Sequence, residues 1–138
     1  MSRSGVEDGH SPLSSVRVLV VDDMIAIREV VAEVLELHGA EVSTVATADE
    51  ALRSVQDWRP DALLSDIQMP DRDGYWLIAH VRGLAPECGG RTPAAALTGL
   101  TGPEDRARVL KAGFQCHLAK PVDLEELVGA VATLALRP

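Results

Sequence analysis

Four apolar segments of the chain are each followed by residues that can do polar chemistry. These residues are, in chain order, Asp22 and Asp23, then Asp66, Thr98 and Lys120. A short apolar run bounded by turn residues is typical of a strand buried on both faces. The carboxyl ends of parallel strands form the rim at which open α/β sheets bind ligands. We therefore expect three carboxylates, a hydroxyl and an ammonium to meet at one edge of a sheet.

Three carboxylates at one edge repel one another, so this set of residues needs a cation. Two like charges about 4 Å apart repel by about 4 kcal/mol at an effective dielectric constant near 20. Oxygen ligands of high charge suit Mg²⁺ or Mn²⁺. A carboxylate beside such an ion can attack a phosphoryl group, and the ion and an ammonium can neutralise charge on the phosphoryl oxygens. The set therefore favours phosphoryl transfer.

The elements that would position these residues alternate along the chain. Strands are expected at Arg17–Asp23, Glu41–Ala46, Ala62–Asp66, Ala94–Thr98 and Phe114–Ala119. Helical spacing predicts helices over Met24–His38, from a capping box at Thr47 to near Trp58, over Gly74–Arg82, from Pro103 to Gly113, and from a cap at Asp123 onward. Five strands alternating with five helices predict a parallel sheet covered by helices, with right-handed crossovers.

These motifs resemble the receiver domain of two-component response regulators, a CheY-like family. The resemblance rests on the Asp22-Asp23 pair, Asp-x-x-Met-Pro-x-x-Asp-Gly from Asp66 to Gly74, Ala-Leu-Thr ending at Thr98, and Lys120-Pro121, which occur in the family's order. It covers about residues 16–136. It implies a flavodoxin-like, doubly wound (βα)5 fold, with a five-stranded parallel sheet of order 2-1-3-4-5 and helices on both faces.

The resemblance also implies a role for each site residue. Asp66 would accept the phosphoryl group. Asp23 and Asp66 would bind the metal ion directly, Asp22 mostly through water, and the backbone carbonyl of Gln68 would give another ligand. Lys120 would neutralise charge on the phosphoryl oxygens. Mg²⁺ is the expected ion, with Mn²⁺ as its substitute.

Two further residues are implied to act as a switch. The Thr98 hydroxyl would move toward the phosphoryl group. In the family this movement is coupled to an aromatic ring three residues before the lysine. Here that position is His117, which departs from the more common Tyr or Phe. The resemblance also implies a cis peptide bond between Lys120 and Pro121.

The implied function is that of a phosphoacceptor in a phosphorelay. The donor would be a phosphohistidine on a sensor histidine kinase or a histidine phosphotransfer protein, and the same cleft would slowly hydrolyse the aspartyl phosphate. Such a domain modifies itself and is not a dedicated enzyme. A downstream partner, or a second copy, would bind through the fourth helix, fifth strand and fifth helix. The run from Ser65 to Tyr75 and the run from His117 to Asp123 look like the C-terminal receivers of hybrid sensor kinases, but a stand-alone regulator stays open.

Two other functions share part of this pattern. Haloacid-dehalogenase-like phosphohydrolases also use an aspartyl nucleophile, but they place a second Asp two residues later, where this chain has Gln68. A degenerate receiver that binds partners without phosphorylation would not need Asp66, Thr98 and Lys120 together. Both are less favoured than the phosphoacceptor.

Composition sets the remaining expectations. A chain of 138 residues is long enough for one domain, here a disordered tail or linker over 1–15 and a receiver domain over 16–138. The net charge of −8 weighs against nucleic-acid binding. Cys88 and Cys116 have no metal-type spacing. No apolar segment could span a membrane or act as a signal core, so a cytoplasmic protein without membrane insertion is expected.

Overall fold

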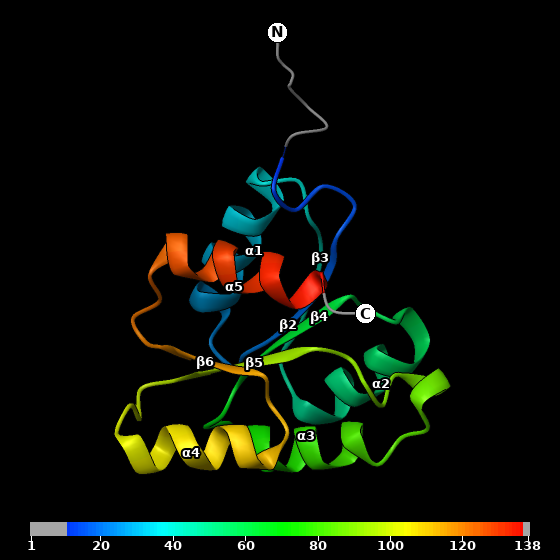
Figure 1. Cartoon of the computed structure of the whole chain (residues 1–138), viewed down its shortest axis with the longest axis vertical. Helices are drawn as coiled ribbons and strands as arrows, with labels where there is room; N and C mark the ends of the chain where they lie inside the picture. Colours follow the sequence, from blue (N-terminus) through cyan, green and yellow to red (C-terminus); the bar gives the residue numbers. More distant parts are fainter. Residues whose placement is uncertain (1–10, 137–138) are drawn as a thin grey trace, which may run out of the picture.

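A single parallel sheet forms the centre of the computed structural model, which describes residues 11–136 (Figure 1). Its strands are β2 (Arg17–Val21), β3 (Glu41–Val45), β4 (Ala62–Asp66), β5 (Ala94–Thr98) and β6 (Cys116–Ala119). They lie in the order β3-β2-β4-β5-β6, and each neighbouring pair is parallel. Numbered by their order along the chain, this is the predicted order 2-1-3-4-5, which is confirmed.

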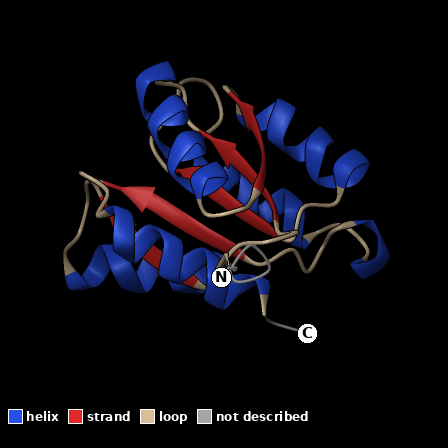
Figure 2. Ribbon diagram, turned by 90° about the horizontal axis from the view of Figure 1, so that it is seen from above, coloured by secondary structure: helices blue, strands red, loops and turns tan. Residues whose placement is uncertain are grey.

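Helices cover both faces of the sheet, as the turned view also shows (Figure 2). They are α1 (Ile25–Leu37), α2 (Ala48–Trp58), α3 (Gly74–Arg82), the short 3-10 helix η2 (Pro86–Cys88), α4 (Pro103–Ala112) and α5 (Leu124–Ala135). Buried residues of α1 and α5 pack in one core cluster, and those of α2, α3 and α4 in another. Among residues 11–136, no helix is long and apolar enough to cross a membrane.

Successive residues of β2 divide between these two clusters. Leu19 and Val21 pack under α2 and α3, whereas Val18 and Val20 pack under α1 and α5. Side chains of a strand point alternately to opposite faces of a sheet. The continuous apolar run of β2 therefore follows from its burial on both faces.

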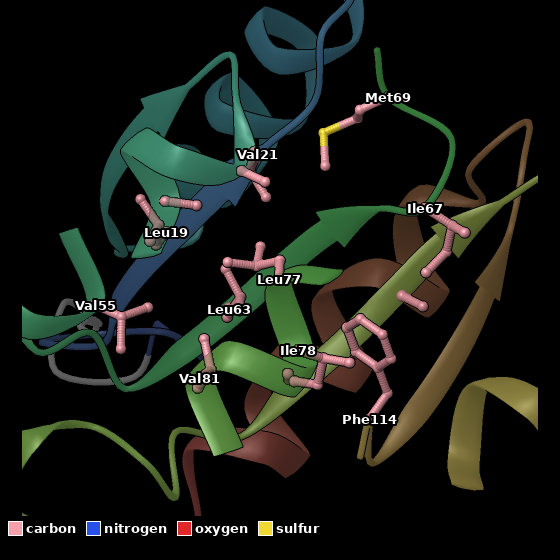
Figure 3. Packing of buried hydrophobic residues seen from close by; sticks show 14 of the residues in the cluster. Leu19, Val21, Val55, Leu63, Ile67, Met69, Leu77, Ile78, Val81 and Phe114 are labelled. Atoms are coloured by element: carbon pink, nitrogen blue, oxygen red, sulfur yellow. The ribbon is translucent and has the colours of Figure 1, made fainter. Parts of the chain in front are cut away.

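Helix α3 is fixed to the sheet close to the end of β4. Its residues Leu77, Ile78 and Val81 are fully buried, and Figure 3 shows them with Leu63 of β4 and the ring of Phe114 in the same cluster. Burying one such side chain contributes about 1.5–3 kcal/mol. This packing holds both ends of the loop that follows Asp66.

The predicted helix caps are present. The Thr47 hydroxyl accepts a hydrogen bond from the Glu50 backbone N–H (3.2 Å), and the Glu50 carboxylate accepts one from the Ala46 N–H (3.1 Å). Asp123 likewise accepts from the Glu126 N–H at 3.0 Å. Each cap satisfies an N–H group that has no partner inside its helix. The caps fix where α2 and α5 begin.

Two predicted boundaries are displaced at the start of the fold. The sequence predicted a strand to Asp23 and a helix from Met24, whereas β2 ends at Val21 and α1 begins at Ile25. The Asp22 carboxylate accepts a hydrogen bond from the Met24 N–H at 2.9 Å. A side chain that bonds the backbone two residues later forms a turn. Both acids consequently lie in the loop.

The folded part also begins earlier than position 16. Most of the predicted tail, residues 1–10, lies outside the described residues. Leu13, however, is fully buried with residues of α1 and α5, and its N–H donates to the His38 carbonyl at 3.0 Å. A single apolar residue among Ser and Pro has no periodicity, so the sequence did not indicate this contact.

Candidate functional site

Three carboxylates meet where β2 and β4 end. Val21 is paired with Ser65 in the sheet, so the residues that follow each of them emerge side by side. One oxygen each from Asp22, Asp23 and Asp66 lies within 4.8 Å of the others. Asp22 and Asp66 are buried, and Asp23 is exposed.

The ammonium of Lys120 lies between two of these acids. Its Nζ atom is 3.1 Å from Oδ2 of Asp22 and 3.0 Å from Oδ1 of Asp66. Lys120 follows β6, which is separated from β4 by β5, so its side chain reaches across the end of one strand. The Lys120–Pro121 peptide bond is cis. The structure thus brings together the carboxylates and the ammonium that the sequence singled out.

The carboxyl of Asp66 is hard to ionise in this setting. The pKa of Asp66 is raised from 3.8 to about 6, chiefly by burial and also by the charge of Asp22 and a hydrogen bond with Asp23, although Lys120 lowers it. For Lys120, burial lowers the pKa, but the hydrogen bonds to Asp66 and Asp22 and the negative charges of these two acids together outweigh burial, so its pKa is raised overall. The ion pairs therefore compensate only part of the cost of placing the acids together.

This pKa gives a pH-dependent stability. Ionisation of Asp66 costs more free energy in the folded chain than in the unfolded one. The fold is therefore more stable at low pH, where Asp66 is protonated, and it loses this stability as the pH rises through about 6. In metal-free buffer we expect Asp66→Asn to be more stable than wild type at pH 8 by about 3 kcal/mol, with the difference closing toward pH 4. Urea unfolding at several pH values measures this.

The matched control is Asp57→Asn, which removes an exposed carboxylate from α2. It should change stability little at either pH. An Asp66→Asn protein that is less stable than wild type at pH 8, or a difference that does not depend on pH, would contradict the raised pKa.

Thr98 and His117 are linked by hydrogen bonds that both make with the backbone of Leu100. The buried Thr98 hydroxyl accepts a hydrogen bond from the Leu100 N–H at 3.0 Å. The Leu100 carbonyl accepts one from Nε2 of His117 at 3.1 Å. Leu100 was not expected to take part, because it does so through its backbone and its residue type carries no signal.

Gln68 lies in the loop two residues beyond Asp66, and its side chain is exposed. It lines a groove of about 440 Å³ between the β4–α3 loop and α4, together with Tyr75, Leu100 and Arg108. The Arg108 guanidinium lies over the Tyr75 ring at 4.1 Å. This groove adjoins the acid cluster through Ile67.

The donor set suits a hard divalent cation. Three carboxylates share one ammonium, so negative charge is in excess, and two of the acids are shielded from water. Such cations take oxygen ligands. The residues present therefore fit Mg²⁺ or Mn²⁺.

Comparison with known proteins decides the family. Residues 18–132 match the response regulator receiver domain family. The chain belongs to this family. The receiver fold and its acidic pocket of Asp22, Asp23 and Asp66 agree with this assignment.

The relatives of this receiver differ in length. A 14.6 kDa protein of the sodA1 3′ region in Leptolyngbya boryana is 40% identical over 124 residues, which are 90% of this chain and 93% of that protein. The transcriptional regulatory protein PrrA of Mycobacterium leprae is 38% identical over 125 residues, which are 91% of this chain and 52% of PrrA. The receiver thus spans about half the length of that regulator.

A solved relative holds a metal ion. The receiver domain of the sensor histidine kinase PA1611 from Pseudomonas aeruginosa PAO1 is 33% identical, with a TM-score of 0.79 over 88% of this chain and 98% of that one. It carries a magnesium ion coordinated in its active-site cleft. Placement of the present receiver within a hybrid kinase stays a prediction.

Proposed function

We propose that this receiver takes a phosphoryl group from a phosphohistidine onto Asp66. The donor is a sensor histidine kinase or a histidine phosphotransfer protein. The observation that carries the proposal is the buried Asp66 carboxylate, 3.0 Å from the Lys120 ammonium and beside Asp22 and Asp23. The carboxylate supplies a nucleophilic oxygen. The Lys120 ammonium beside it can bind the phosphoryl group, and the neighbouring acids can bind a metal ion.

Mg²⁺ is the proposed cofactor, with Mn²⁺ as its substitute. Asp23 and Asp66 would bind it directly, Asp22 mostly through water, and the carbonyl of Gln68 would be a further ligand. When bound, the ion supplies positive charge for the phosphoryl oxygens. In the structure Asp22 is paired with Lys120 at 3.1 Å.

The transfer is a nucleophilic displacement at phosphorus. An Asp66 carboxylate oxygen forms the new P–O bond, the P–N bond to the donor imidazole breaks, and the imidazole leaves with the electron pair. A pKa of about 6 leaves Asp66 mostly ionised at neutral pH. Lys120, already 3.0 Å from this carboxylate, is positioned to bind a phosphoryl oxygen. Attack of water on the same phosphorus breaks the P–O bond to Asp66, which releases inorganic phosphate and restores the carboxylate.

Thr98 would report the modification to the surface. Recruitment of its hydroxyl by a phosphoryl oxygen would alter the hydrogen bond from Leu100, and with it the contact of Leu100 with His117. The affected surface would be α4, β6 and α5, where a downstream partner or a second copy would bind.

Amide hydrogen exchange on the phosphorylated receiver measures this response. We expect changed exchange in the β5–α4 loop, β6 and the start of α5. The change should be much reduced in Thr98→Val, which cannot donate to the phosphoryl group. Identical exchange in the phosphorylated and unmodified proteins would refute this route.

Intact-protein mass after incubation with acetyl phosphate and Mg²⁺ tests the proposed acceptor. We expect one phosphoryl adduct on wild type. None should form on Asp66→Asn, or on wild type when a chelator removes the metal. An adduct of equal yield on Asp66→Asn would mean that another residue is the acceptor.

A further inference from the structure

The loop that joins β2 to α1 carries two of the three carboxylates, yet α1 lacks a capping side chain. Among the α-helices of the described chain, α2, α3 and α5 are capped by Thr47, Asp73 and Asp123, and α4 begins with Pro103. The N-cap residue of α1, Met24, makes no such bond, and the first turn holds no acid. Other contacts must hold this loop.

Those contacts converge on Asp22. Its Oδ1 atom accepts from the Met24 N–H at 2.9 Å, and its Oδ2 atom from Lys120 at 3.1 Å. Its backbone carbonyl accepts from Nη1 of Arg28 at 2.7 Å. Arg28 is half-buried and is the fourth residue of α1. It therefore binds the peptide group that joins Asp22 to Asp23.

We infer that Arg28 is a positioning residue for the divalent-cation site, because it fixes the peptide from which the Asp23 carboxylate extends. Asp23 is exposed, whereas Asp22 and Asp66 are buried, so Asp23 depends most on its backbone for its place in the cluster. The inference rests on the proposed function, since it assigns a further residue to the same site.

The positive charge of Arg28 opposes cation binding, whereas its positioning of the acids favours cation binding. A guanidinium close to the acids repels a bound cation, so its removal would tighten Mg²⁺ binding if charge dominated. Removal would weaken binding if the placement of Asp22 and Asp23 dominated. Mutation of residues that orient metal ligands typically lowers the metal affinity 10- to 100-fold. The electrostatic effect of a charge in contact with water is reduced by screening. Weaker binding is therefore the expected result.

Three substitutions separate the two effects. Arg28→Met keeps a long apolar stem but removes the donor and the charge. Arg28→Lys keeps both. Arg53→Met is the matched control, because it removes the same charge from an exposed position on α2, which packs on the opposite face of the sheet.

Calorimetric titration with Mg²⁺ alone, together with amide exchange of the metal-free protein, provides the test. We expect Arg28→Met to bind Mg²⁺ about tenfold more weakly than wild type, with faster exchange over residues 22–26. The Mg²⁺ affinity of Arg28→Lys should lie within about threefold of the wild-type affinity. The affinity of Arg53→Met should equal that of wild type.

Binding by Arg28→Met that equals or exceeds wild type would overturn the inference, as would a defect that Lys does not restore. The wild-type titration separately tests the proposed function. A wild type that binds no Mg²⁺ would overturn the proposed cofactor and this inference together, whereas a binding wild type with an unaffected Arg28→Met overturns the inference alone.

Discussion

Gly74→Ala is expected to destabilise the receiver by about 3 kcal/mol or more, because a β-carbon at this position has no space. It would lie 2.5 Å from the carbonyl oxygen of Asp66 and 2.9 Å from both Cα and Cδ1 of Ile67. The first of these contacts is with backbone, which cannot turn aside as a flexible side chain can. The Gly74 N–H also donates to the Ile67 carbonyl at 2.8 Å, so helix and loop cannot separate without losing that bond.

The same substitution should disturb the site. The clash falls on the peptide of Asp66 itself, so relief of the clash moves the acceptor carboxylate relative to Asp22 and Asp23. We expect weaker Mg²⁺ binding in addition to a lower melting temperature, by about 10 °C. Thermal unfolding with and without Mg²⁺ measures both effects.

Gly83→Ala is the matched control at the other end of α3. A β-carbon there would make only ordinary contacts, at 3.5 Å from the carbonyls of Ala79 and His80. Its stability should stay within about 1 kcal/mol of wild type. A Gly74→Ala protein as stable as Gly83→Ala would show that α3 does not pack against the acceptor strand as closely as described.

Lys120→Met has the second large expected effect. It removes both ion pairs and leaves the buried carboxylates of Asp22 and Asp66 without their ammonium. Loss of one partner of a buried pair strands the other charge. We expect a loss of about 2 kcal/mol at pH 8 in metal-free buffer, which Mg²⁺ should partly restore because it binds the folded acids. Phosphorylation by acetyl phosphate should slow about 100-fold.

Lys111→Met controls for the loss of a lysine. It replaces the other lysine of the chain, which is exposed in the last turn of α4. Its stability and phosphorylation rate should stay close to wild type. If Lys120→Met were phosphorylated as fast as Lys111→Met, the ammonium would have no part in the transfer.

The acid cluster could be predicted because its signal lies in residue types. Asp22, Asp66 and Lys120 each follow an apolar run, and parallel strands bring their carboxyl ends to one edge. The strand order was implied by the family resemblance alone, since apolar periodicity says which segments are strands and not which strands are neighbours.

What the sequence did not show depends on backbone contacts. Arg28 binds a carbonyl of Asp22, and His117 reaches Thr98 through both backbone groups of Leu100. A carbonyl or N–H belongs to every residue type, so no motif marks it. Leu13 was missed for a related reason, because one isolated apolar residue gives no period from which burial can be predicted.

Localisation of the phosphoryl group most directly tests the central claim that Asp66 is the acceptor. Borohydride reduces an acyl phosphate to an alcohol and releases phosphate, so a phosphorylated aspartate becomes homoserine, which tandem mass spectrometry can place in a peptide. We predict homoserine at position 66, dependent on both phosphodonor and Mg²⁺. Homoserine at another aspartate, or an unaltered Asp66 in protein that carries the adduct, would contradict the account.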